Sequence, residues 1–200
     1  METLDNKKYV VTLDNKQYVV DALMSTGRPG MEDLIQYMEE CGFFEAPCST
    51  KFHLASKFGL VHHTRNVMET AERIGVALLG GAEYNKIQES VIITAGLHDL
   101  GKMGQFEKPL YAAKKLKDGS DAKAPYEQNK DLLPVDHEIR SIAIASMFID
   151  LTEEEQFAIL YHNGLYGTVG RYSLQGHETQ LYLIVHTADL WCSRFVEVKS

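Results

Sequence analysis

The sequence predicts one mostly helical domain, and three observations support this fold class. Apolar residues recur three and four residues apart from about residue 60 to the end of the chain, which is the spacing of one helix face. Glycine and proline interrupt this pattern at intervals typical of helices about 8–20 residues long. The chain has 200 residues, 44% hydrophobic and 24% charged, which fits one globular domain with its own core. We therefore expect an all-α bundle with one small β element.

The first 25 residues are the expected exception to the helical pattern. Residues 4–11 and 13–20 form a near-repeat in which Tyr and Val, which favour strands, follow Asp-Asn, which favours turns. This pattern predicts a small β-hairpin that turns at residues 14–16. A Gly- and Pro-containing breaker then separates a β-ribbon appendage over residues 1–25 from the main domain over residues 26–200.

The main domain is predicted to hold helices in succession, which cover residues 31–41, 60–79, 83–100, 134–148, 152–162 and 178–196. Thr152 and Glu155 form a capping-box pattern at the start of the fifth of these. The Lys-rich stretch 104–133 is expected to be a long loop with a short helix at residues 110–116. Loops of this length inside a domain are typical of lids or binding segments.

Composition narrows the classes of function. The net charge of −8 argues against broad, sequence-independent binding to long nucleic acid, although bound cations can reverse the charge of a site locally. No apolar run reaches the roughly 18–20 residues that cross a bilayer, and the N-terminus lacks a secretory pattern, so we expect a cytoplasmic protein without membrane contact. The cysteines, Cys41, Cys48 and Cys192, form no CxxC pair and are expected to be reduced, packed thiols.

Histidines and aspartates in the order H…HD…H…H…D carry the strongest chemical signal. The candidates are His63, His98, Asp99, His137, His162 and Asp189. Taken singly, each histidine has a structural explanation, such as a favourable position at a helix end. Taken together, imidazoles and carboxylates suit a divalent transition metal, and six ligands can serve two ions if Asp99 bridges them. His62 and His63 point about 100° apart on one helix, so only one of them can serve.

Several segments together resemble the HD-domain superfamily of metal-dependent phosphohydrolases, over about residues 43–196. The motifs that carry the resemblance are Gly59-Leu60-Val61-His62-His63-Thr64-Arg65-Asn66-Val67, His98-Asp99-Leu100-Gly101-Lys102, Asp136-His137-Glu138, Tyr161-His162-Asn163-Gly164 and His186-Thr187-Ala188-Asp189. The chain is most similar to bacterial and phage HD hydrolases and is also similar to the HD domain of 3′-to-5′ exoribonucleases. It lacks the N-terminal nucleic-acid-binding barrel of the exoribonucleases.

The resemblance implies an HD-domain helical bundle and a ligand set, and it selects His63 over His62. One ion is assigned to His63, His98, Asp99 and Asp189, and a second to Asp99, His137 and His162. We therefore expect one or two divalent transition metal ions (Mn, Fe, Zn, Ni or Co) per chain. Relatives with two metals often have a second histidine where this chain has Asn163.

Catalytic roles are expected for Asp99 and for Lys102, which could meet a phosphate oxygen or stabilise developing charge. Lys51 and His53 are expected on the substrate side, because Ser49-Thr50-Lys51-Phe52-His53 resembles a substrate-side loop of the exoribonucleases. Asn163 and Lys102 complete the predicted substrate-binding residues.

The expected activity is hydrolysis of a phosphomonoester or phosphodiester by a metal-activated hydroxide. The expected substrate is a phosphorylated small molecule, namely a nucleotide or a short oligonucleotide. Two alternatives remain open at this point. The same six ligands serve mixed-valence diiron oxygenases of HD type, and a non-catalytic HD scaffold could sense a nucleotide or assemble through residues 1–25.

Overall fold

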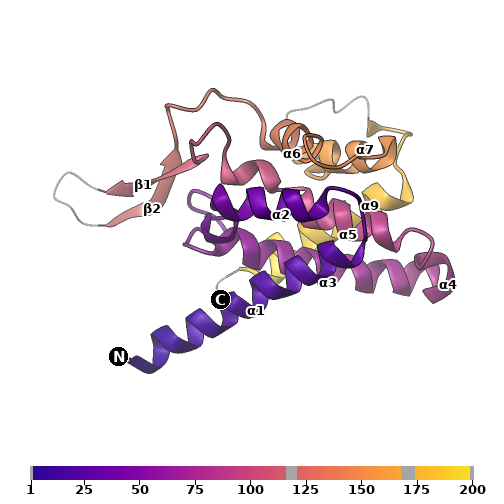
Figure 1. Ribbon diagram of the computed structural model, residues 1–200, viewed down its shortest axis with the longest axis horizontal. Coiled ribbons are helices and arrows are strands. Elements are labelled where there is room, and N and C mark those ends of the chain that lie inside the picture. Colours follow the sequence, from indigo (N-terminus) through magenta and orange to yellow (C-terminus); the bar gives the residue numbers. More distant parts are fainter. Residues whose placement is uncertain (1, 116–120, 168–173, 199–200) are drawn as a thin grey trace.

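The computed structural model describes residues 2–115, 121–167 and 174–198, and most of these are helical (Figure 1). The α-helices are α1 Glu2–Ser25, α2 Met31–Glu40, α3 Gly59–Leu79, α4 Gly81–Tyr84, α5 Gln88–Leu97, α6 His137–Ala145, α7 Glu153–Tyr161 and α9 Gln180–Trp191. Short 3₁₀ turns are η1 Phe43–Glu45, η2 Leu100–Met103 and η3 Gly164–Tyr166, and η4 Cys192–Val196 is a π turn. The two strands, β1 Tyr111–Lys115 and β2 Asp121–Gln128, pair antiparallel. The prediction of a mostly helical fold is confirmed.

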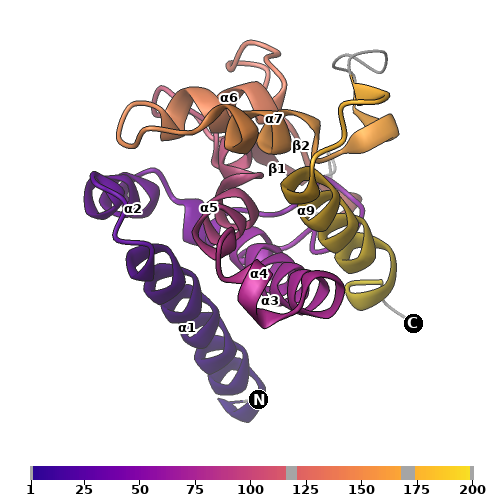
Figure 2. The same cartoon turned by 90° about the vertical axis from the view of Figure 1, so that its right-hand side faces the viewer.

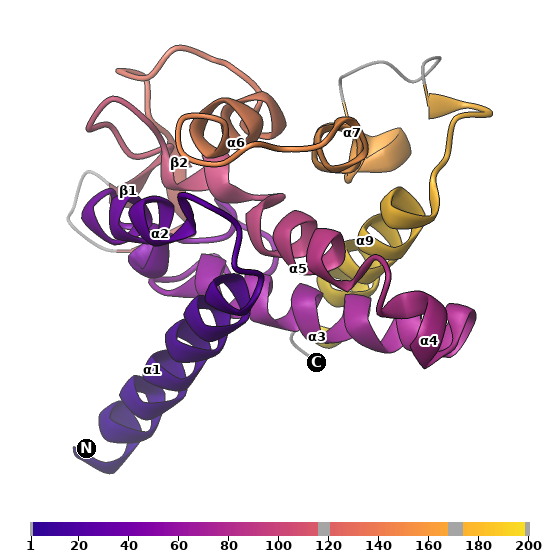
Figure 3. The same ribbon diagram turned by 45° about the vertical axis from the view of Figure 1, so that its right-hand side comes forward.

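Helix α5 lies in the middle of the molecule, where it contacts α1, α3, α7 and α9 (Figure 3). Six of its ten residues are buried, including Ile93 and Leu97, as expected for a helix that is apolar on most sides. Gly96 lets α1 approach closely, because a Cβ there would lie 2.8 Å from the Leu23 side chain. His98 and Asp99 follow α5 directly, so this packing holds both residues deep in the fold.

The prediction of a β-hairpin over residues 1–25 is wrong, because this segment forms α1. Asn15, Val19 and Leu23 lie four residues apart on one face of the helix and are buried. Val19 and Leu23 belong to the same hydrophobic core as residues of α3 and α5. Helix α1 lies alongside α3 and α5 (Figure 2). Strand propensity is strongly context-dependent, and here the packing of this helical face outweighs the preference of Tyr and Val for strands.

The small β element lies instead within residues 104–133, so the short helix predicted over residues 110–116 is also wrong. Tyr111 pairs with Gln128 and Ala113 with Tyr126, and the hairpin projects from the helical body (Figure 1). The Tyr126 amide also donates a hydrogen bond to the carbonyl oxygen of Thr50 at 3.3 Å, which ties the hairpin to the segment before α3. An isolated helix of seven residues would be marginal, whereas the hairpin satisfies its backbone groups across the strand pair.

The remaining predicted helices are confirmed with changes at their ends. The segment 83–100 divides into α4 and α5, and the helix predicted to end at residue 196 ends as a regular α-helix at Trp191. The capping box of α7 forms as predicted, with Thr152 and Glu155 each accepting a hydrogen bond from the other's backbone amide. In the described part of the chain, no helix combines the length and apolar character needed to cross a bilayer.

Candidate metal centre

Asp99 lies at the centre of the predicted ligand cluster and is 1% exposed. Its Oδ2 atom is 3.4 Å from His98 Nε2 and 3.5 Å from His63 Nε2. Asp189, from α9, adds a carboxylate on this side, with its Oδ1 3.1 Å from His63 Nε2. Three helices, α3, α5 and α9, therefore bring the first half of the cluster together.

The other carboxylate oxygen of Asp99 faces a second pair of histidines. Oδ1 lies 3.1 Å from His137 Nε2, at the start of α6, and 3.4 Å from His162 Nε2, at the end of α7. All six predicted ligands are thus brought together around one buried carboxylate. Each oxygen of that carboxylate faces a different pair of imidazoles.

The close approach of α6 to η2 places the second half of the cluster. The Gly101 amide donates a hydrogen bond to Ser141 Oγ at 2.8 Å, and Ser141 Oγ donates to the carbonyl oxygens of His98 and His137. A Cβ at Gly101 would lie 2.2 Å from the carbonyl oxygen of His137, so only glycine fits at this contact. Gly101, two residues after Asp99, therefore has a steric reason to be glycine.

Polar contacts at Nδ1 orient all four histidines with Nε2 toward Asp99. His98 and His162 each donate from Nδ1 to a carbonyl oxygen three residues earlier, at 2.8 Å. His63 Nδ1 lies 3.0 Å from both oxygens of Glu197, and His137 Nδ1 lies 3.2 Å from Glu138 Oε2. A carbonyl acceptor requires N–H at Nδ1, so the neutral imidazole directs its Nε2 lone pair toward the cluster. This is the usual arrangement of metal-ligating histidines.

The cluster fits a bound cation. The Oδ1 atom of Asp99 is buried and accepts no hydrogen bond among the described residues, which is costly unless another positive group meets it. The distances of 3.1–3.5 Å between Nε2 and carboxylate oxygens are also suitable. Two ligand atoms about 2.1 Å from one ion are roughly 3.0–3.4 Å apart at octahedral or tetrahedral angles. His63, His98 and Asp99, and separately Asp99, His137 and His162, could each hold a metal ion.

Charges around Asp99 keep it ionised. Burial acts to raise the pKa of Asp99, but Lys102 and His98 outweigh it and hold that pKa well below its ordinary value. Lys102 Nζ lies 2.6 Å from Asp99 Oδ2, and this pairing, against the effect of burial, raises the pKa of Lys102 well above its ordinary value. The pKa of Asp189 is also lowered, since the hydrogen bond and charge of His63 outweigh burial. At neutral pH both carboxylates are therefore ionised and Lys102 is protonated.

Three of the four predicted substrate-side residues lie at the cluster. Lys102 contacts Asp99, as described above. Asn163 Nδ2 donates to Glu138 Oε1 at 2.7 Å and lies 3.0 Å from His162 Nε2. His53 lies against the His63 ring, and its Nδ1 is 2.6 Å from Glu197 Oε2.

Lys51 is the residue that the structure does not bring to the cluster. Its side chain is exposed, and its ammonium lies over the Phe52 ring, 5.1 Å from the centroid. Among the described residues it makes no hydrogen bond or ion pair with a predicted ligand.

Glu197 and Glu138 support the ligands and were missed by the sequence analysis. Glu138 directly follows His137, so its position next to a predicted ligand was the available signal. Glu197 comes eight residues after Asp189, and eight residues of regular α-helix would rotate it about 80° away from the Asp189 face. The π turn η4 takes up more residues per turn, so Glu197 returns to contact His63 on the ring edge opposite Asp189. Neither composition nor spacing predicts that turn.

Cys48 forms a third group with His53 and His63 that could hold an ion. Burial raises the pKa of its thiol to about 11, so the neutral thiol is the stable form without a metal. His63 is shared with the Asp99 cluster, and its Nδ1 is already engaged by Glu197. We therefore assign Cys48 a packing position beside the cluster.

A small opening of about 60 Å³ leads to the cluster between the end of α7 and α9. It is lined by His162, Asn163, Tyr166, His186, Asp189, Leu190, Ser193 and Arg194. His186 Nδ1 lies 2.6 Å from the carbonyl oxygen of His162, and its ring stacks on Tyr182. His186 therefore fixes the backbone that carries a predicted ligand.

Comparisons with known proteins neither support nor oppose the family resemblance of the motifs. No family model, curated protein or solved structure matches this chain. The geometry therefore stands alone as the structural support for a metal centre, and membership of the HD superfamily stays a prediction.

Proposed function

We propose that the protein is a metal-dependent phosphohydrolase with a binuclear centre bridged by Asp99. One observation carries the proposal: each carboxylate oxygen of Asp99 faces its own pair of Nε2 atoms, and Oδ1 accepts no hydrogen bond. A single buried carboxylate between two imidazole pairs is the donor arrangement that suits two divalent transition metals.

The residues of the proposed centre divide into two groups that share Asp99. His63, His98 and Asp189 would hold one ion, and His137 and His162 would hold the other. Divalent cations in these positions supply Lewis acidity toward a phosphoryl oxygen and a water of lowered pKa. We propose Mn, Fe, Zn, Ni or Co, because imidazole and carboxylate ligands together suit these metals.

The charge of the site supports an anionic substrate only when both positions are filled. Four carboxylates and one ammonium lie in or against the cluster, from Asp99, Asp189, Glu138, Glu197 and Lys102. One divalent cation leaves this set net negative, whereas two make it net positive. Binding of a phosphate group therefore favours the binuclear form.

Lys102 is placed to stabilise charge rather than to accept a proton. Its pKa is raised well above the ordinary value, so the ammonium persists at neutral pH beside the bridging carboxylate. A fixed positive group at this position would stabilise negative charge that develops on the phosphoryl oxygens.

The residues around the opening support a nucleotide as the substrate, with only its phosphate group entering the opening. Arg194, Ser193 and Asn163 supply hydrogen-bond donors for phosphate oxygens, and the guanidinium of Arg194 lies over the Tyr166 ring, 5.3 Å from its centroid. Tyr166 is 71% exposed, so its ring offers a surface on which a base can stack. We propose a nucleotide or a short oligonucleotide, with its base on the face of the Tyr166 ring that Arg194 does not cover.

The test measures phosphate or nucleotide release from a panel of nucleotides and short oligonucleotides in the presence of Mn²⁺. We expect release by the wild type and by His177→Ala, a control that changes an exposed histidine outside the cluster. Asp99→Asn and His98→Ala should lose the activity while keeping the helical circular dichroism spectrum. Equal release by Asp99→Asn would sink the proposal. Iron-dependent oxygen uptake on an organic substrate without phosphate release would replace it with a diiron oxygenase.

A further inference from the structure

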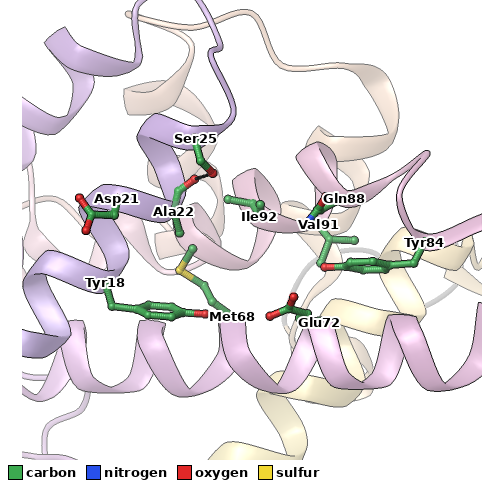
Figure 4. Close-up of a pocket in the computed structure, with 10 residues that line it drawn as sticks. All are labelled: Tyr18, Asp21, Ala22, Ser25, Met68, Glu72, Tyr84, Gln88, Val91 and Ile92. Atoms are coloured by element: carbon green, nitrogen blue, oxygen red, sulfur yellow. Dashed lines mark hydrogen bonds between the residues drawn. The ribbon is translucent and has the colours of Figure 1, made fainter. Parts of the chain in front are cut away.

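A second cavity, of about 320 Å³, lies between α1, α3, α4 and α5 (Figure 4). It shares no residue with the Asp99 cluster. Its volume is within the range of about 300–1,000 Å³ that is usual for small-molecule sites. It therefore has room for a ligand of its own.

Three polar groups from three helices point toward the same space in this cavity. The hydroxyls of Tyr18 and Tyr84 and the carboxylate of Glu72 converge there (Figure 4). None of the three makes a hydrogen bond or an ion pair with the residues that the structure describes. The Tyr84 side chain is only 2% exposed and directs its hydroxyl into the cavity, Tyr18 is half-buried, and Glu72 lies at the exposed rim. The arrangement offers three hydrogen-bonding groups to a ligand in the cavity.

The sign of the charge in the cavity selects the class of ligand. Among the residues that the structure describes, the charged side chains in its lining are the carboxylates of Glu72 and Asp21, both at its exposed rim. Arg65 and Arg73, whose charges act on Tyr18, lie outside the lining; the Arg65 guanidinium lies over the Tyr18 ring, 5.0 Å from its centroid, and is paired with Glu69. Burial raises the pKa of Tyr84 to about 12, with the charge of Glu72 adding to the shift, so this hydroxyl stays neutral. An anion would be repelled, whereas a cation would be stabilised.

The apolar part of the lining excludes a bare metal ion as the natural occupant. Met68, Val91 and Ile92 form the wall beside the three polar groups (Figure 4). A metal ion would leave this surface exposed to water and would find few ligand oxygens. An organic cation would cover the apolar wall with its body and place its charge against Glu72.

We propose that this cavity binds a small primary ammonium compound, with the ammonium between Glu72 and the two tyrosine hydroxyls and an apolar body over Met68. Each N–H of the ammonium then has an acceptor in Glu72, Tyr18 or Tyr84. The site goes beyond the proposed hydrolase and does not depend on it.

The experiment follows the methyl resonance of Met68 in protein labelled with ¹³C-methyl methionine. n-Hexylamine at neutral pH, where it is an ammonium ion, is titrated beside 1-hexanol, its neutral analogue of similar shape. We expect saturable shifts of the Met68 signal with n-hexylamine, while the exposed Met147 signal stays in place. Equal affinity for 1-hexanol would overturn the proposal. So would shifts of other methionine signals without a shift of the Met68 signal.

Three variants sharpen this test. Glu72→Gln keeps the shape and removes the charge, so n-hexylamine should bind at least about tenfold more weakly. Tyr84→Phe keeps the ring that packs on Gly75 and should weaken binding about fivefold. Glu32→Gln, an exposed position on α2, is the matched control and should change nothing. Wild-type affinity in Glu72→Gln would contradict the assignment.

A further titration separates a free amine from a lysine side chain of another protein. Nα-acetyl-lysine methyl ester carries the same ammonium on a bulkier, more polar body. Weaker binding than that of n-hexylamine supports a free small amine. Tighter binding would overturn this assignment.

Discussion

Two buried carboxylates in this molecule, Glu155 and Asp99, have opposite surroundings. Glu155 accepts hydrogen bonds from Arg28 on both oxygens, from Ser90 Oγ and from the Thr152 amide, at 2.8–3.1 Å. Asp99 accepts one such bond, from Lys102, and its Oδ1 atom accepts none. The chain therefore supplies hydrogen-bond donors to both oxygens of Glu155, whereas one oxygen of Asp99, which lies among four imidazoles, has none.

The difference separates a structural ion pair from a proposed ligand. A carboxylate has about four lone-pair sites, and Glu155 fills them with its own chain, so a ligand would have nothing to add. Asp99 has sites left over, in a place from which water is largely excluded. We infer that Glu155 links the segment before α2 to α5 and α7, and that Asp99 is a ligand for cations.

The largest expected effect is on thermal stability in the presence of metal. At about a thousandfold excess of Mn²⁺ over its Kd, one bound ion should stabilise the fold by about 4 kcal/mol, or roughly 8–16 °C in Tm. Asp99→Asn should abolish this shift, and Glu155→Gln should keep it from a lower starting Tm. Thermal unfolding with chelator and with Mn²⁺ measures both. A wild-type Tm shift with Mn²⁺ in Asp99→Asn would contradict the assignment of Asp99 as a metal ligand.

Glu155→Gln should cost about 3–5 kcal/mol of stability in chelator, because it breaks a buried pair and weakens the capping of α7. Denaturant unfolding measures the loss. Glu154→Gln, an exposed neighbour in the same helical turn, is the control and should change stability by less than about 0.5 kcal/mol. A loss of similar size in both variants would mean that the Arg28 pairing is not the cause.

The Glu197→Gln variant tests whether the π turn supports only one half of the proposed centre. Glu197 contacts Nδ1 of His63 and no ligand of the other half, so one of two ions should bind about 10–100-fold more weakly. Calorimetric titration with Mn²⁺ should resolve a tight and a weakened step. Two binding steps with unchanged affinity would contradict a supporting role of Glu197 at His63.

The pH dependence of Glu155 has a definite sign. Burial acts to raise its pKa, but the hydrogen bonds of Arg28, Thr152 and Ser90 outweigh burial and hold the pKa below the ordinary 4.5. A depressed folded-state pKa contributes stability above about pH 4.5, and this contribution is lost as the pH falls through the folded value. The difference in unfolding free energy between wild type and Glu155→Gln, measured in chelator, should therefore shrink from pH 6 to pH 3. A constant difference would contradict this assignment.

The smallest expected effect concerns His62, which precedes a proposed ligand. His62→Ala should retain two ions, because only the His63 ring faces Asp99. His63→Ala should lose one. Elemental analysis of protein passed through a desalting column gives both stoichiometries, and loss of an ion in His62→Ala would reverse the choice between the two residues.

The sequence predicted the residues of the candidate site more completely than it predicted the secondary structure around them. The ligand residue types and their order were visible at His63, His98 and Asp189, because metal chemistry restricts which side chains can serve. The N-terminal helix was missed because its buried face, Val19 and Leu23, is defined by packing partners distant in sequence. Glu197 was missed because its position depends on a local π turn, which no residue pattern in the sequence predicts.

The most direct test of the bridged centre is anomalous X-ray diffraction from crystals grown with Mn²⁺. The account predicts two anomalous peaks, one on each side of the Asp99 carboxylate, the first against His63 and His98 and the second against His137 and His162. No peak at Asp99, or peaks only at other residues, would contradict the claim that this carboxylate joins two metal sites.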